Sequence, residues 1–223
     1  VITSDKYSFC LGGLQRLIKK YWKEDNLEIT ILGFNTPNVE LLEGFSFQSL
    51  GDNLNDSTPW KDALNPFFQN LEDDYFFLCF EDHFIIDDVN LQHMKMAQEI
   101  MENDPSIGKI RLHPKYNDDM CIGEYNEYFE LGPTIPNSYV ATSLRPSIWR
   151  KSLFLKLLNH IAGIKTPHNF ERFNDGDNIN TKVLIPKIRT TIYSDLDAMR
   201  GGNINPQGLS AGKINMEIGR AHV

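Results

Sequence analysis

FFLCFEDHFIID, residues 76–87, is the stretch on which the interpretation of the whole sequence depends. A short apolar run leads directly into Glu81, Asp82 and His83, and the chain then becomes apolar again. Near-continuous apolar runs are typical of central strands that are covered on both faces. Ligands of open α/β sheets lie just beyond the carboxyl ends of such strands. The stretch therefore predicts a buried strand that ends in two carboxylates and an imidazole.

The spacing of these three side chains leaves two interpretations open. Carboxylate and imidazole ligands suit Mg²⁺ or Mn²⁺, and a divalent ion bound to a diphosphate neutralises the charge that develops on a leaving group. A solvated turn with a helix cap nearby accounts for the same residues, because acids and histidines commonly follow strands.

Composition narrows the class of protein. The chain has 223 residues, 41% hydrophobic and 23% charged, as in ordinary globular domains. The net charge of −8 argues against a nucleic-acid partner, since phosphate binding needs clustered Lys and Arg. No apolar run approaches the roughly 20 residues that span a bilayer, and we see no signal peptide. Three widely spaced cysteines indicate a reducing compartment, so we expect a cytoplasmic protein, either free or peripherally attached to a membrane.

Apolar periodicity predicts an α/β protein with a mixed, mainly parallel sheet flanked by helices. In the first half we expect strands at 27–34, 45–50, 74–82 and 108–112, with helices at 11–22, at 58–71 and from Asp87 or Asp88 to Asp104. Thr58 is the expected cap of the second helix, which Pro66 should kink or end early. In the second half we expect strands at 128–132 and 138–144, a helix starting at Pro146, a strand pair within 182–193 and a glycine-rich loop at 200–208.

Residues 1–216 are interpreted as a single domain, because neither an internal repeat nor a low-complexity linker interrupts them. Residues 217–223, EIGRAHV, resemble the translation of a sequencing adapter and are interpreted as a non-native tail. A genuine polar tail is the alternative.

The stretch DYFFLCFEDHFIIDDVN, residues 74–90, resembles the metal-binding strand end of nucleotide-sugar glycosyltransferases of the GT-A (Rossmann-like) fold. In that family an acidic motif, often Asp-x-Asp or Glu-Asp-Asp, follows a buried strand. The resemblance implies that Asp82 is the central acid and that His83 takes the place of the last aspartate. It also implies a bound Mn²⁺ or Mg²⁺ held by Asp82 and His83. The histidine is a departure from the pattern, since it brings no negative charge.

Further segments are similar to the same family in order and spacing. ITSDKY, residues 2–7, resembles the first strand and loop, which implies that Thr3, Asp5 and Tyr7, together with Glu81 and Asp82, contact the nucleotide. Residues 57–78 resemble the helix that leads into the metal-binding strand, and residues 201–203, GGN, resemble the segment that closes the site.

TPHNFE, residues 166–171, resembles the acceptor-side segment, where an aromatic residue precedes a catalytic carboxylate. The resemblance implies that Glu171 is this carboxylate, with Asp175 and Asp177 as reserve choices. A structural ion pair between Glu171 and Arg172 is the alternative.

The resemblance implies a metal-assisted, inverting glycosyltransferase of polysaccharide biosynthesis. Residues 1–115 would bind the nucleotide-sugar donor, and residues 116–216 would bind a glycan, lipid-linked or protein acceptor. A nucleotidyltransferase is one alternative, although its phosphate loop would have only Lys6 and Gly12-Gly13 to draw on. A non-enzymatic carbohydrate-binding module is the other. Arg111 and Arg145 are further candidates for holding a phosphate, His113 is a candidate ligand or substrate contact, and His168 is a candidate contact of the substrate or the metal.

Overall fold

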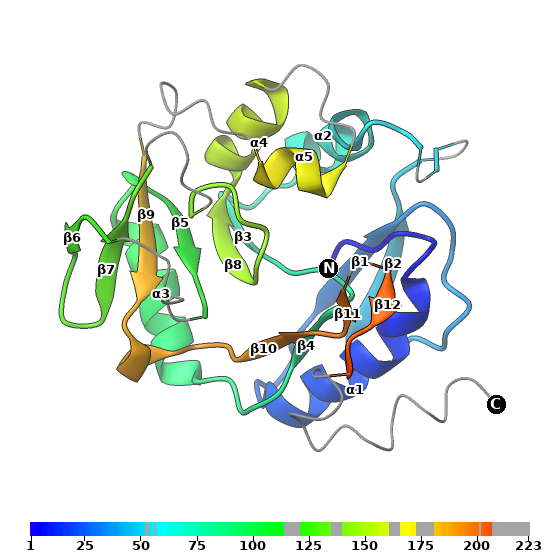
Figure 1. Ribbon diagram of the computed structural model, residues 1–223, viewed down its shortest axis with the longest axis horizontal. Coiled ribbons are helices and arrows are strands. Elements are labelled where there is room, and N and C mark those ends of the chain that lie inside the picture. Colours follow the sequence, from blue (N-terminus) through cyan, green and yellow to red (C-terminus); the bar gives the residue numbers. More distant parts are fainter. Residues whose placement is uncertain are drawn as a thin grey trace.

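A computed structural model of the chain describes residues 1–51, 54–55, 57–113, 121–134, 140–160, 166–172, 181–200 and 202–206 (Figure 1). Its helices are α1 (Leu11–Tyr21), α2 (Trp60–Asn70), α3 (Leu91–Asn103), α4 (Lys151–His160) and α5 (Pro167–Glu171). Its strands are β1 (Ile29–Gly33), β2 (Phe45–Ser49), β3 (Tyr75–Leu78), β4 (His83–Ile85), β5 (Ile107–Arg111), β6 (Gly123–Glu124), β7 (Phe129–Gly132), β8 (Ser147–Arg150), β9 (Lys182–Pro186), β10 (Asp195–Asp197), β11 (Met199–Arg200) and β12 (Asn203–Ile204). Short 3-10 turns lie at Ser8–Cys10 and Ile188–Thr190.

A six-stranded sheet in the order β3-β8-β5-β9-β7-β6 forms the centre of the protein. The first residues of the chain extend this sheet towards the parallel pair β1-β2. Ile2 bridges both Leu32 and Phe80 in parallel, and its N–H donates to the carbonyl of Cys79 at 3.0 Å. The start of the chain therefore lies between β1 and the residues just beyond β3. The expectation of a strand covered on both faces is wrong for β3 itself, because it is the edge strand of the six-stranded sheet and only Leu78 among its residues is buried.

The mixed α/β class with flanking helices is confirmed, but parallel pairing predominates only around the N-terminal strands. Within the six-stranded sheet, β5-β9 is parallel, whereas β3-β8, β8-β5, β9-β7 and β7-β6 are antiparallel. Connection length explains part of this difference, since parallel neighbours need a crossover of about a dozen residues. The turn between β6 and β7 is far shorter than that, with the Asn126 side chain accepting from the N–H groups of Tyr128 and Phe129, so these strands can only run antiparallel.

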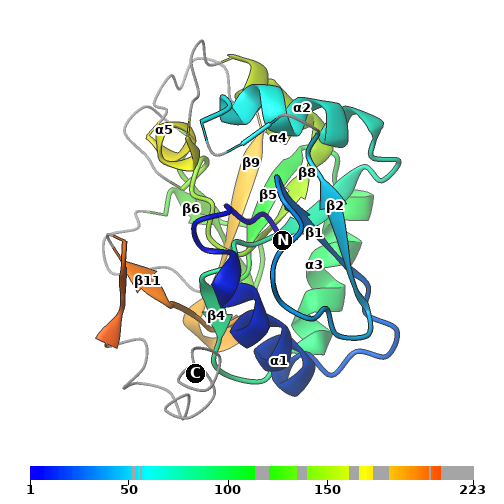
Figure 2. The same ribbon diagram turned by 90° about the vertical axis from the view of Figure 1, so that its right-hand side faces the viewer.

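Helices pack on both faces of the sheet. In Figures 1 and 2, α2, α4 and α5 lie together at the top, whereas α1 and α3 lie below them. Leu14 and Ile18 of α1 and Met94 of α3 share one buried cluster with Ile110 of β5. The second cluster is largely aromatic and contains, among others, Trp60, Phe68, Trp149, Phe154 and Phe170. The aromatic cluster lies behind α5 and fixes the position of this short helix.

Several expected elements of the second half are wrong. Trp149 lies in strand β8 rather than in a helix from Pro146, and α4 begins only at Lys151. Trp149 and its neighbour Ile148 are both buried. The prediction of a helix was wrong here because two adjacent apolar residues fit a strand as well as a helix. Residues 140–144 are turn and coil rather than strand. A 3-10 turn replaces the second strand expected within 182–193, and the expected glycine-rich loop contains β11 and β12.

Two helix starts also differ from expectation. Asn90 caps α3 by accepting the N–H of His93 at 3.0 Å, whereas Asp88 pairs with Lys23 on the surface. Pro59, not Thr58, is the cap residue of α2. This helix continues through Pro66 to Asn70 despite the missing N–H, because Leu64 and Phe68 on either side of the proline are buried in the aromatic cluster.

Candidate functional site

A cavity of about 520 Å³ lies beyond the end of β3 and joins the two halves of the chain. From the first half it is lined by Ile2, Thr3, Ser4, Lys6, Tyr7, Phe34, Leu50, Thr58, Trp60, Phe80, Glu81, Asp82 and His83. From the second half it is lined by Leu144, Thr166, Pro167, His168 and Glu171. Of the residues that the family resemblance assigns to the nucleotide, the metal and the base, all except Asp5 therefore line one cavity. Most of its wall is apolar, and its ionisable side chains lie at the end of β3, on the loop after Ile2 and on α5.

Glu81 is the most buried acid of the cavity, with 3% of its surface exposed. Its Oε1 accepts two hydrogen bonds from Ser4, one from the backbone N–H at 3.1 Å and one from the hydroxyl at 3.2 Å. Burial raises the pKa of Glu81 to about 7; the bonds from Ser4 oppose this rise, and the charge of Asp82 adds to it. Because Oε1 is bound to the first loop, Glu81 holds the start of the chain against the end of β3.

Asp82 lies beside a second acidic group, formed by Asp195 and Asp197 of β10. Its carbonyl accepts the N–H of Ala198 at 2.8 Å. Burial raises the pKa of Asp82 to about 6; the charge of Asp197 adds to this rise, while Arg145 lowers it. Arg145 donates to Asp195 at 2.8 Å and to both carboxylate oxygens of Asp197. One guanidinium therefore offsets part of the negative charge of three aspartates.

His83 is neutral, because burial and, to a smaller extent, the charge of Arg145 lower its pKa to about 3. Its Nδ1 accepts the N–H of Phe80 at 3.4 Å. A neutral ring whose Nδ1 accepts a hydrogen bond carries its proton on Nε2. In this tautomer neither ring nitrogen offers a lone pair to a metal, so His83 is arranged as a hydrogen-bond donor.

The predicted metal site would draw on these side chains. In the part of the chain that the structure describes, no group of three or more His, Cys, Asp or Glu side chains is placed to hold a metal ion. Mg²⁺ and Mn²⁺ are nevertheless often held by one or two carboxylates together with substrate phosphates. Asp82 fits that arrangement, whereas His83 needs the other tautomer, so Mn²⁺ or Mg²⁺ stays a prediction that rests on Asp82.

The expected nucleotide contacts occupy different positions. Thr3 and Tyr7 line the cavity. Asp5 lies outside its lining and accepts the side-chain amide of Asn35 at 2.7 Å and its backbone N–H at 3.2 Å. Asp5 thus ties the first loop to the turn after β1, and its contact with a ribose stays a prediction. Gly202, in the expected closing segment, lies against this loop: a Cβ atom there would be 3.6 Å from the Tyr7 hydroxyl.

Glu171, at the end of α5, lies on the opposite wall. Its Oε1 accepts the N–H of Leu144 at 2.8 Å, and its backbone carbonyl accepts the hydroxyl of Thr142 at 2.8 Å. Thr166 caps α5 by accepting the N–H of Asn169, and Phe170 is buried, so the helix is held at both ends. The alternative ion pair between Glu171 and Arg172 is not found among the described contacts. The reserve candidates Asp175 and Asp177 lie outside the described residues.

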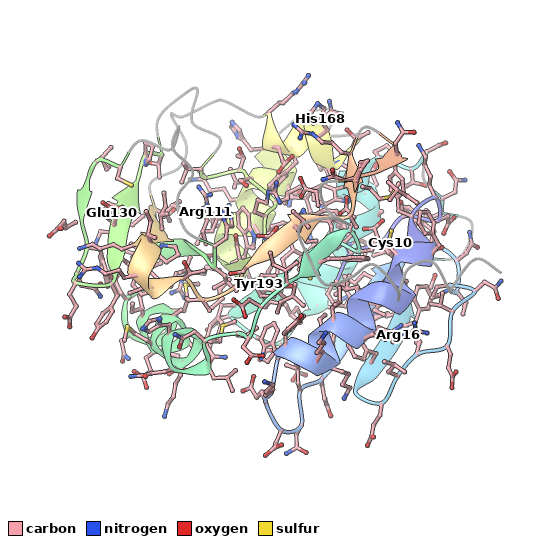
Figure 3. All side chains as sticks on the ribbon, turned by 60° about the horizontal axis from the view of Figure 1, so that its bottom comes forward. Cys10, Arg16, Arg111, Glu130, His168 and Tyr193 are labelled. Carbon is pink, nitrogen blue, oxygen red and sulfur yellow. The ribbon has the colours of Figure 1, made fainter. Side chains whose placement is uncertain are left out.

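The remaining candidates fall into two places. His168 of α5 lines the cavity, whereas Arg111 and His113 are buried, with Arg111 Nε 3.2 Å from His113 Nε2. Figure 3 shows His168 and Arg111 on separate parts of the molecule. Arg111, the last residue of β5, and His113, two residues beyond it, are therefore buried in the core.

Sequence reasoning missed the groups that hold the acids in place. Ser4, Thr142 and Leu144 act through hydrogen bonds whose partners lie 77, 29 and 27 residues away, and no local pattern marks such pairs. Asp195 and Asp197 did carry a signal, since they form an Asp-x-Asp sequence at the end of the chain's last predicted strand.

No protein-family model matches the sequence, and no curated protein matches it significantly. The structure is similar to that of S. aureus TarS 1–349, with 15% identity, a TM-score of 0.40 and coverage of 71% of this chain and 47% of that one. The same TarS fragment in complex with UDP gives 15% identity, a TM-score of 0.42 and coverage of 72% and 47%. A 4-diphosphocytidyl-2C-methyl-D-erythritol synthase from Anaerococcus prevotii gives 10% identity, a TM-score of 0.37 and coverage of 81% and 89%. The chain thus spans about half the length of the TarS structures, and at these scores neither the site nor the function is assigned from them.

Proposed function

We propose that the protein transfers a sugar from a nucleotide-sugar donor to an acceptor hydroxyl. The observation that carries this proposal is the single cavity that brings Thr3, Tyr7, Glu81 and Asp82 together with Glu171. The sequence resemblance assigns the first four to the donor and the last to the acceptor. Residues 80–83 and 171 are far apart in the chain, so their meeting in one cavity supports the assignment independently of the order of the motifs.

Glu171 is the proposed general base. It removes the proton of the acceptor hydroxyl, whose oxygen attacks the anomeric carbon as the bond from that carbon to the diphosphate oxygen breaks. The nucleoside diphosphate leaves with the electron pair of the broken bond, and in-line attack inverts the anomeric carbon. The hydrogen bond from Leu144 leaves the second carboxylate oxygen, Oε2, as the one to accept the proton.

The first loop is the proposed nucleotide-binding wall. The Tyr7 ring can stack on a base, and Lys6, whose ammonium lies 5.0 Å from the Tyr7 ring centroid, brings a positive charge to the same wall. The Nε2–H of His83 is a hydrogen-bond donor towards sugar or phosphate oxygens. The Thr3 hydroxyl donates to the Ser4 carbonyl at 3.2 Å, so towards a ligand it can accept a hydrogen bond. If a divalent ion is bound, Asp82 would hold it, and the ion would supply positive charge to the leaving diphosphate.

The two alternatives are supported less well. Gly12 and Gly13, which a nucleotidyltransferase would need in a phosphate loop, lie within helix α1. A carbohydrate-binding module has no need of a carboxylate held by a backbone N–H on the far wall. No helix among the described residues is long and apolar enough to cross a membrane, and the cytoplasmic location and the acceptor class stay predictions.

Titration calorimetry with UDP, GDP, CDP and ADP, each with and without Mn²⁺, tests the proposal. We expect one of them to bind at micromolar concentration and a nucleoside triphosphate to bind no better. Tighter binding of a triphosphate would favour the nucleotidyltransferase. Binding of free sugars without any nucleotide would favour the carbohydrate-binding module.

A further inference from the structure

We propose that Arg145 is a positioning residue that fixes the proposed base Glu171 relative to the acidic end of β3. The proposal rests on the proposed function. It concerns the turn of residues 140–145, which connects the two walls of the cavity and in which the sequence pointed only to Arg145, as a candidate phosphate ligand.

The turn holds Glu171 on one side. Leu144 donates its N–H to Glu171 Oε1 and Thr142 its hydroxyl to the Glu171 carbonyl, both at 2.8 Å. Thr142 is 1% exposed, so water does not compete readily for this contact. The orientation of the Glu171 carboxylate is therefore set by the position of the turn.

The next residue holds the acidic end of the sheet. Arg145 donates from Nη1 to Asp195 and Asp197 and from Nη2 to the other oxygen of Asp197, at 2.9 Å. Bidentate pairs of this kind fix geometry as well as charge. Asp197 is the register partner of His83 in the β4-β10 ladder, and the N–H of the following residue donates to the Asp82 carbonyl. Leu144 and Arg145 thus connect the base to the acids across a single peptide bond.

A buried cation supports the turn from below. Lys109 of β5 is fully buried and donates to the carbonyls of Val140, at 3.0 Å, and Ser143, and its ammonium lies 4.3 Å from the centre of the Trp149 ring. The turn is bound to Lys109 of β5, to Glu171 and, through Arg145, to β10. Loss of the Arg145 contacts would therefore leave the turn free to shift on its β10 side. A shift of about 1 Å in a catalytic group can cost a hundredfold in rate, so loss of this tie should reduce turnover before it reduces binding.

The test is a double-mutant cycle between Arg145 and Glu171. The assay measures release of nucleoside diphosphate from the nucleotide sugar that the parent turns over, with water or an added acceptor as the nucleophile. Arg145→Gln should lower kcat 10- to 100-fold with the donor KM within threefold, and Arg145→Lys, which keeps the charge without the fork, should fall between. Lys187→Gln, which removes a cation paired with Glu124 at the far sheet edge, is the matched control and should leave kcat unchanged.

The decisive comparison is made in the Glu171→Gln background. If Arg145 acts through Glu171, Arg145→Gln should cause no further loss there. An equal loss in both backgrounds, or a kcat that falls only in proportion to folded protein, overturns the role of Arg145 while the proposed function stands. A parent that releases nucleoside diphosphate from no nucleotide sugar overturns both.

Discussion

The two carboxylates on opposite walls of the cavity, Glu81 and Glu171, are held in different ways. Glu81 is only 3% exposed, follows the longest apolar run of the sequence and accepts two hydrogen bonds from Ser4. Glu171 is half-buried, ends a five-residue helix and receives its bond from the turn at Leu144. Glu81 is desolvated and has a raised pKa, whereas Glu171, the proposed base, lines the cavity from the opposite wall.

This difference assigns separate tasks to the walls. A buried carboxyl with a pKa of about 7 joins two chain segments and is poorly suited to meet an acceptor. A carboxylate that is anchored through one oxygen and reaches the cavity with the other suits proton transfer. The experiments below separate the walls, beginning with the largest expected effect.

Glu171→Gln should reduce turnover on the order of 10²–10⁴-fold, because the amide cannot take the acceptor proton. The variant should bind nucleoside diphosphate as the parent does, since the donor wall is untouched. The assay is release of nucleoside diphosphate at saturating donor, with the melting temperature as the control for folding. A variant with full activity removes Glu171 from the mechanism.

Asp82→Asn should weaken nucleoside diphosphate binding in the presence of Mn²⁺ by about a hundredfold, as expected when an anionic ligand of a metal–diphosphate complex is lost. Calorimetry with and without Mn²⁺ measures this effect. Equal affinity of parent and variant in Mn²⁺ would place any metal elsewhere.

Glu81→Gln should change stability in a pH-dependent manner. In the parent, folding raises the pKa of this carboxyl from 4.5 to about 7, so the folded state keeps a proton that the unfolded state releases over that range. The resulting stabilisation is present below pH 4.5 and is lost as the pH rises through 7. The amide stays neutral and can still accept from Ser4, so the variant should gain up to roughly 3 kcal/mol over the parent at pH 8 and little at pH 4.

Urea unfolding of parent and variant at both pH values measures this gain. A stability difference that does not change between pH 4 and pH 8 would show that Glu81 has an ordinary pKa in the folded protein.

Tyr7→Ala should weaken nucleotide binding about tenfold, the range expected for loss of one stacked base. Asp5→Ala should have a smaller effect, because Asp5 contacts Asn35 and acts on the site only through the loop. Calorimetry on both single variants and the double variant distinguishes them. A larger effect of Asp5→Ala would mean that its carboxylate contacts the ribose directly.

The sequence was sufficient for the wall that carries Glu81 and insufficient for the turn opposite. The near-continuous apolar run before Glu81 predicted a strand followed by the acids, and both are found, although β3 lies at the edge of the six-stranded sheet and is mostly half-buried. At Trp149 a period of two and a period of 3.6 fit the same few apolar residues, and the pairing of β8 with β3 on one side and β5 on the other makes this segment a strand. The tie from Arg145 to Asp195 and Asp197 spans 50 and 52 residues, and it exists only once β10 has paired with β4.

The most direct test of a transferase with both walls in one site is the identity of the product released by the parent protein. A panel of UDP-, GDP-, CDP- and ADP-sugars, and of nucleoside triphosphates with sugar 1-phosphates, is incubated with Mn²⁺ and the products are separated by anion exchange. We predict release of a nucleoside diphosphate from one nucleotide sugar and no pyrophosphate from any triphosphate. Release of pyrophosphate, or binding of sugars with no product from the whole panel, would contradict the account.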